Sequence, residues 1–133
     1  MRKETKSEKQ ARHDFYEAVL ATAYLFREGC WFQSIIPHKC DGPLDPCHLI
    51  DKQGLWVFEK ELEAIEFMVY DVRNGVPGCR HIHDRFDQRN IRIYQDELPD
   101  SVFMFITDWE DALGRPGVLH EKLNRKCPKG ARP

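Results

Sequence analysis

The clustering of cysteine and histidine is the feature that most restricts what this 133-residue chain can fold into. The chain has five cysteines and six histidines, and His48, His81 and His83 lie beside or near cysteines. An odd number of cysteines, without a secretory signal segment, does not indicate a disulfide framework. We therefore expect a reducing cytosol, in which spaced Cys and His residues are metal ligands or buried thiols.

The length and composition favour one domain that spans residues 1–133. Apolar residues make up 41% of the chain and charged residues 32%. The longest apolar runs, such as Ala18–Ala21 and Val102–Ile106, are only a few residues long. A membrane-spanning helix needs about 20 apolar residues, so we expect no membrane-spanning segment and no membrane partner.

Apolar residues three and four positions apart predict an N-terminal packing helix over about residues 7–28, which ends near Gly29. Prolines and glycines then break residues 30–50 into a strand and turns. A second helix is predicted over residues 54–67. Four acidic residues are expected on its outer face: Glu59, Glu61, Glu63 and Glu66.

The second half of the chain alternates turns with short elements. Residues 79–88 are predicted to be helical, and residues 91–94 have the apolar pattern of a short strand. A helix is expected to begin near Leu98, and a last helical segment spans residues 120–125. The basic tail of about 126–133 is expected to be disordered.

Three separate segments contain the residues that phosphodiester hydrolysis needs. They are DPCHLIDKQ with His48, RNGVPGC with Asn74 and CRHIHDRFD with His83. A neutral imidazole can take a proton from water, and a divalent cation can stabilise the charge that develops at phosphorus. His83 and Asp87 are four residues apart, so on a helix both face the same side.

These segments resemble the HNH nuclease superfamily, and in particular small HNH proteins of bacteriophages, over about residues 30–110. The resemblance implies an α+β fold with a small ββα-metal core over about residues 30–94 and flanking packing helices. It implies His48 as the general base, Asn74 as the residue that orients the base-carrying loop, and His83 as a metal ligand. The implied cofactor is one divalent ion: Mg²⁺, Mn²⁺, Ni²⁺ or Zn²⁺.

Cys47 departs from the family pattern, because many HNH nucleases have an acidic residue or a histidine directly before the first motif histidine. A thiolate binds Zn²⁺ well and Mg²⁺ poorly. Four outcomes stay open: the ion has fewer protein ligands, Asp45 reaches it, the ion is thiophilic, or cleavage has been lost. The candidate ligands are therefore His83, Asp87, Cys47 and Asp45.

Many relatives also hold a second, structural zinc through two CxxC pairs, and here each pair keeps one cysteine, Cys40 and Cys79. Cys30, His38 or His81 can complete a non-standard zinc site. Our candidate ligand set is Cys30, Cys40, Cys79 and His81. The alternative is a group of buried free thiols.

Basic residues near the motif are the candidate DNA contacts: Lys52, Arg80, Arg85 and Arg89. The formal net charge of -2 argues at first against nucleic acid. However, residues 1–13 carry five Lys+Arg and two Asp+Glu, and residues 122–133 carry five Lys+Arg and no acids. The whole-chain balance hides two basic ends and does not exclude DNA.

The sequence therefore predicts a metal-dependent HNH DNA endonuclease that nicks or cleaves DNA. The resemblance implies a phage-encoded enzyme in the cytoplasm of a bacterial host cell, working alone or beside a packaging or recombination partner. The alternative is a catalytically silent HNH-like module, stabilised by zinc, that binds DNA or a protein.

Overall fold

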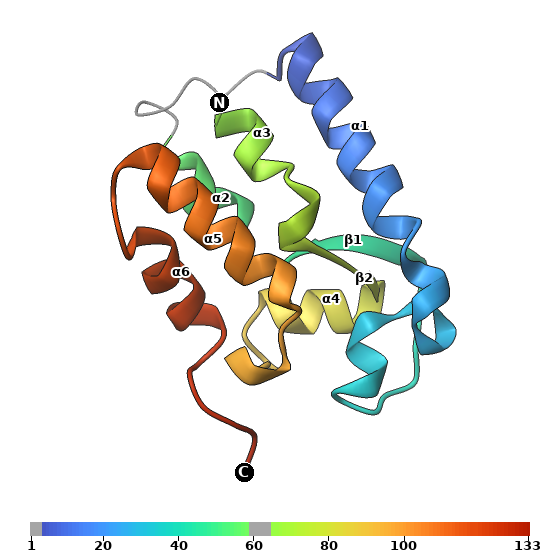
Figure 1. The fold of residues 1–133 in the computed structure, drawn as a ribbon. Coiled ribbons are helices and arrows are strands. Elements are labelled where there is room, and N and C mark those ends of the chain that lie inside the picture. The colour runs from blue at the N-terminus through green and yellow to red at the C-terminus, as the bar shows by residue number, and fades with distance from the viewer. Residues whose placement is uncertain (1–3, 59–64) are drawn as a thin grey trace.

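A computed structural model describes residues 4–58 and 65–133 (Figure 1). Two antiparallel strands, β1 (Leu44–His48) and β2 (Gly75–Cys79), form a small sheet. Helix α1 (Lys6–Leu20) covers one face of this sheet, and α4 (Arg80–Asp87) lies against the other. The described part of the chain is therefore α+β, as the sequence predicts.

The other helices complete the element order. They are α2 (Lys52–Trp56), α3 (Ile65–Val69), α5 (Asp100–Leu113) and α6 (Val118–Lys126). Five 3-10 turns connect these elements: Ala23–Leu25, Arg27–Gly29, Trp31–Ser34, Val72–Asn74 and Gln95–Glu97. Among the described residues, no helix is both long enough and apolar enough to cross a membrane.

The sheet pairs His48 with Gly75 at one end and Leu44 with Cys79 at the other. Pro46 lies directly opposite Pro77 in the middle. Proline has no N–H group to donate, so this pair can only occupy a position whose backbone groups point away from the partner strand. The register places His48 at the end of β1 and starts α4 directly after β2.

Helix α1 packs closely on the sheet through Phe15 and Val19, which are both buried. A Cβ atom on Gly75 would lie 2.6 Å from Val19 and 2.7 Å from Phe15, so this approach requires glycine. The helix ends at Leu20, which corrects the predicted end near residue 28. The hydroxyl group of Thr22 donates to the Val19 carbonyl, and the backbone is extended at Phe26, so the chain continues in 3-10 turns instead.

Two further predictions are corrected or fall outside the described residues. Residues 91–94 form no strand, although Ile93 is fully buried in the core. The apolar pattern of residues 91–94 therefore reflects packing against the core rather than strand pairing. The predicted helix over residues 54–67 appears as α2 and α3, and its middle, with Glu59, Glu61 and Glu63, lies outside the described residues, as does the side chain of Glu66.

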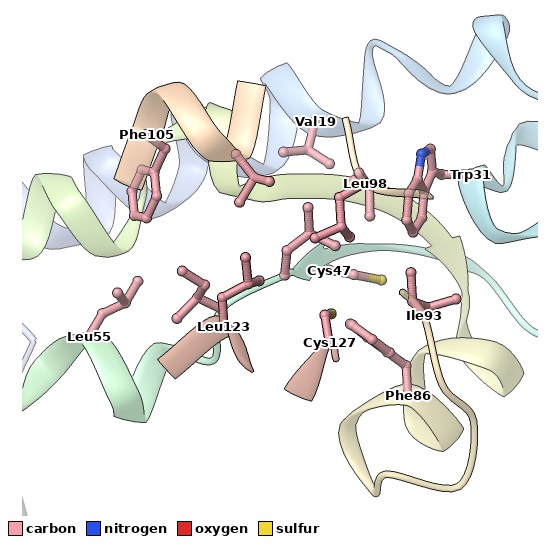
Figure 2. Packing of buried hydrophobic residues seen from close by; sticks show 14 of the residues in the cluster. Val19, Trp31, Cys47, Leu55, Phe86, Ile93, Leu98, Phe105, Leu123 and Cys127 are labelled. Atoms are coloured by element: carbon pink, nitrogen blue, oxygen red, sulfur yellow. The ribbon is translucent and has the colours of Figure 1, made fainter. Parts of the chain in front are cut away.

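The core joins α5 and α6 to the sheet (Figure 2). Phe105 of α5, Leu123 of α6 and Phe86 of α4 are all buried in one apolar cluster. Ile82 and Phe86, four residues apart on α4, both face this core as predicted. Glu110 of α5 accepts hydrogen bonds from the Leu119 and His120 backbone amides in the first turn of α6, which fixes the N-terminus of that helix against α5.

The end of the chain differs from the expected disordered tail. Lys126 is the last residue of α6, and Cys127 is fully buried in the core. The Pro128 carbonyl accepts from the Gln95 backbone amide, and Arg132 pairs with Glu97 at 2.9 Å. Composition alone favoured disorder, but burial of Cys127 and these contacts hold the segment on the domain.

Candidate functional site

A cluster of three cysteines and one histidine lies where the loop before β1 meets the end of β2. Cys30 precedes the Trp31–Ser34 turn, His38 and Cys40 belong to the loop, and Cys79 is the last residue of β2. Their ligand atoms all lie within 4.8 Å of one another. We call Cys30, His38, Cys40 and Cys79 the sulfur cluster.

The dimensions of the sulfur cluster match those of a tetrahedral metal site. His38 Nε2 lies 3.7 Å from Cys30 Sγ and 3.5 Å from the Sγ atoms of both Cys40 and Cys79. Zinc bonds of about 2.3 Å to sulfur and about 2.0 Å to nitrogen at tetrahedral angles place these atoms roughly 3.5 Å apart. The sulfur cluster can therefore hold a metal ion such as zinc.

Backbone groups prepare these side chains for a metal. The Ile36 carbonyl lies 2.6 Å from His38 Nδ1, so this nitrogen donates and Nε2 keeps its lone pair. Burial would raise the pKa of Cys79, but the backbone N–H groups of Ile82 and Asp41 lower it below the ordinary thiol value. Burial instead raises the pKa of Cys40. Metal binding would therefore have to release protons from this cluster.

The structure selects His38, and not His81, as the fourth member of the sulfur cluster. His81 is exposed on α4 and belongs to no group of potential ligands among the described residues. It lies two residues beyond Cys79, after the chain has turned into the helix, whereas His38 lies on the loop that crosses Cys79. The candidate set with His81 is therefore corrected at its histidine, because the choice between His38 and His81 depends on tertiary packing.

Cys47 lies in the core and belongs to no ligand group in the described chain (Figure 2). It is fully buried, and its Sγ atom would lie 3.0 Å from a Cβ atom on Gly78. Burial raises its pKa well above the ordinary thiol value. The expectation that Cys47 reaches the ion beside His83 is therefore corrected. Neighbouring residues of a strand face opposite sides, so Cys47 and His48 point to opposite faces of the sheet, and His48 lies on the face that α1 covers.

A cleft with a volume of about 620 Å³ opens beside the end of β1. It contains both motif histidines, His48 and His83, although they come from different elements. Five basic residues also line it: Lys52, Arg89, Lys122, Arg125 and Lys126. The acidic residues in its wall are Asp51 and Asp87, so the cleft carries more positive than negative charge.

His48 is held as a neutral imidazole. Its Nε2 atom donates to the Val69 carbonyl at 2.8 Å, and its ring stacks on Phe15 with centroids 4.6 Å apart. Burial lowers the pKa of His48 to about 4. The hydrogen bond assigns the proton to Nε2, so Nδ1 keeps the lone pair that a general base requires.

Asn74 fixes the backbone that follows His48. Its side chain is fully buried, accepts from the Ile50 N–H at 2.8 Å and donates to the Ile50 carbonyl at 2.9 Å. Its own carbonyl accepts from the Leu49 N–H at 2.9 Å. Asn74 does not line the cleft, so it acts on the site only through the backbone of this segment.

His83 lies between two carboxylates. Its Nδ1 atom is 3.2 Å from Asp45, and its Nε2 atom is 3.0 Å from Asp87. The hydrogen bond to Asp87 raises the pKa of His83 despite partial burial. The two carboxylates approach opposite sides of the ring, so one ion cannot join both through a single nitrogen. His83 and Asp87 face the cleft, whereas Asp45 does not line it and instead pairs with Arg80.

Only some of the predicted DNA-contacting residues lie at the cleft. Lys52 and Arg89 line the cleft, but Arg80 and Arg85 do not. The sequence missed three basic residues of α6 that do line it: Lys122, Arg125 and Lys126. The basic charge of residues 122–133 was the available signal. The expected disorder of residues 126–133 kept Lys126 from being assigned to the site, and no spacing rule linked the predicted helix over residues 120–125 to the motif.

Comparisons with known proteins give no relative for this chain. No protein-family model matches it, and neither a curated protein nor a solved structure matches it. A function for this chain therefore rests on the geometry and chemistry of its own residues.

Proposed function

We propose that this protein is a metal-dependent HNH-type DNA endonuclease and that the cleft is its active site. One observation carries this proposal: His48 and His83, which are far apart in the sequence, line the same basic cleft. The order β1, β2, α4 supports a ββα-metal core, with His48 at the end of the first strand and His83 on the helix. The bacterial cytoplasm, the phage origin and a packaging or recombination partner remain predictions.

The cations of the cleft suit a polyanionic substrate. Lys52, Lys122 and Arg125 surround the space next to His48, and basic side chains bind nucleic-acid phosphates with loss of counterions. Such contacts position a strand without selecting its sequence. They would place a phosphodiester group over the two histidines.

His48 would act as the general base. Its Nδ1 atom takes a proton from water, the water oxygen attacks phosphorus, and the bond from phosphorus to the 3′ oxygen breaks. The proton is returned to the leaving 3′ oxygen, so the products are a 5′ phosphate and a 3′ hydroxyl. Asn74 keeps His48 in place by holding the backbone of Ile50.

His83 and Asp87 are the residues that fit a divalent ion in the cleft. Their nearest nitrogen and oxygen atoms lie 3.0 Å apart, a separation typical of two neighbouring ligands with bonds of about 2.1 Å. Such an ion supplies charge neutralisation at phosphorus. Asp45 on Nδ1 would orient the imidazole as an outer partner rather than bind the ion.

A catalytically silent DNA-binding module is the second candidate function. The observation that favours it is that the polar atoms around His83 already pair with one another. Both ring nitrogens of His83 have carboxylate partners, and Asp87 also pairs with Lys126 at 3.0 Å. The cleft contributes no group of three potential metal ligands among the described residues.

Plasmid nicking with Mg²⁺, Mn²⁺ or Ni²⁺ tests the proposal. We expect His48→Ala to lower the nicking rate about 100-fold or more, because the base is lost. His13→Ala is the matched control, since His13 is exposed on α1, pairs with Glu17 and does not line the cleft, and this variant should cut normally. The silent module is correct if the wild type binds DNA without converting supercoiled plasmid, and His48 is not the base if His48→Ala cuts equally well.

A further inference from the structure

Lys126 is a buried lysine next to both histidines of the cleft. Only 4% of the residue is exposed. Its Nζ atom donates to Asp51, to Asp87 at 3.0 Å and to the His48 carbonyl at 3.3 Å. The ammonium group also lies 4.0 Å from the centre of the Phe86 ring.

All donors of this ammonium group are used within the protein. A lysine ammonium has three N–H donors, and Lys126 has three oxygen partners. It therefore has no donor left for a substrate phosphate, unlike the half-buried Lys122 and the exposed Arg125. Lys126 can therefore affect the site only through the protein groups that it contacts.

Asp87 is the residue through which Lys126 can act. One carboxylate oxygen of Asp87 pairs with His83 Nε2 and the other with Lys126 Nζ. Both oxygens of this carboxylate are therefore already engaged within the protein. An anion that is ready to bind a divalent ion is thus already neutralised by a cation of the protein.

We infer that Lys126 is an internal cation of the cleft, which holds Asp87 and Asp51 while the site has no divalent ion and thereby sets a low affinity for that ion. The inference rests on the proposed metal site at His83 and Asp87. A divalent ion on Asp87 would lie close to the ammonium group, and two such cations repel each other strongly in a partly buried site. Removing the ammonium charge should therefore strengthen metal binding, by roughly tenfold.

The same lysine also positions the general base. Its bond to the His48 carbonyl ties α6 to the end of β1, so its loss should loosen His48 relative to Asp87. The neutral variants are then expected to bind metal more tightly and to cut more slowly. A residue that merely stabilised the fold would change both properties in the unfavourable direction.

Mn²⁺ binding to the zinc-loaded protein, followed by titration calorimetry and electron paramagnetic resonance, tests this inference. We compare Lys126→Met and Lys126→Gln with the wild type and expect an approximately tenfold lower Kd in each. Lys126→Gln keeps hydrogen-bond donors and is the decisive variant if Lys126→Met does not fold, as judged by its Tm. Lys126→Arg keeps the charge and should stay within twofold of the wild type.

Lys129→Met is the matched control, because it removes the charge of an exposed lysine three residues further along the chain that does not line the cleft. A change below threefold is expected there. The inference is overturned if both neutral variants bind Mn²⁺ no more tightly than the wild type, or if Lys129→Met has the same effect. It stands if the affinity rises as expected while the wild type fails to nick DNA, an outcome that rejects only the nuclease proposal.

Discussion

The sulfur cluster and the cleft bring similar chemical groups together in opposite ways. In the sulfur cluster, three thiols and one imidazole nitrogen converge, and their ligand atoms all lie within 4.8 Å of one another. In the cleft, Asp87 is already paired with both His83 and Lys126. Ligand atoms whose lone pairs converge need a bound cation to satisfy them. Charged side chains that pair with one another are neutralised without a bound cation. The first arrangement is typical of a structural metal site and the second of a site that exchanges its cation.

The largest effect that would test this contrast is loss of the sulfur cluster. Cys79→Ser should abolish stoichiometric zinc binding and lower the free energy of unfolding by at least about 4 kcal/mol, because structural zinc contributes on the order of 10 kcal/mol to folding. Zinc content by mass spectrometry and urea unfolding measure the two quantities. Removal of zinc from the wild type with a chelator should also lower the free energy of unfolding.

Cys127→Ala is the control for that experiment. Cys127 is as buried as Cys79 but does not belong to the sulfur cluster. The Cys127→Ala variant should retain zinc, and its stability should fall only by the lost packing of one thiol. If Cys79→Ser keeps its zinc and its stability, the sulfur cluster is a group of buried thiols and the contrast with the cleft fails.

A smaller effect is expected from Asn74, on which the geometry of the cleft depends. Asn74→Ala removes two hydrogen bonds and leaves the buried N–H and C=O groups of Ile50 without these partners. We expect a loss of about 3 kcal/mol in the free energy of unfolding, with zinc content unchanged. Urea unfolding is the measurement. Asn90→Ala, at an exposed position, should change stability by less than about 0.5 kcal/mol.

The smallest effect is a pH dependence that comes from His48. The pKa of His48 is about 4 in the folded protein, against about 6.5 in an unfolded chain. Between these values the unfolded chain binds a proton that the folded chain does not, so stability falls as the pH falls. Between pH 7.5 and pH 5 the loss attributable to His48 is about 2 kcal/mol. His48→Gln, which can still donate to Val69, should lack this part of the pH dependence.

His83 should show the opposite sign, which sharpens the contrast within the cleft. Its pKa is raised by Asp87, so its contribution to stability is present below pH 6.5 and is lost as the pH rises through the folded pKa. His83→Asn should therefore be most destabilising at low pH. Equal slopes for the two variants would contradict the assignment of a neutral His48 and a carboxylate-paired His83.

The HNH resemblance implied the α+β class. Local sequence was enough to predict the helix over residues 79–88 and the core-facing pair Ile82 and Phe86. These features depend on spacing along one segment and on turn residues. The pairing of His48 and His83 in one cleft was anticipated only through the HNH resemblance. Its catalytic meaning remains a prediction.

The features that local sequence did not predict depend on contacts between distant segments. His38 joins Cys79 because the loop before β1 crosses the end of β2, and no spacing rule separates it from His81. Lys126 reaches Asp51 and Asp87 only because α6 packs beside the cleft. The position of Lys126 near the end of a basic segment had instead favoured a disordered tail.

The opposed prolines of the sheet limit intermolecular strand pairing. In a sheet of two strands, both outer edges are available for pairing with a foreign strand. Pro46 and Pro77 lie opposite each other, so each removes the outward N–H at the middle of its own edge and puts a ring there. A third strand therefore has no continuous row of donors on either side. The smallest sheet that can carry His48 and Cys79 is in this way protected against strand-by-strand aggregation.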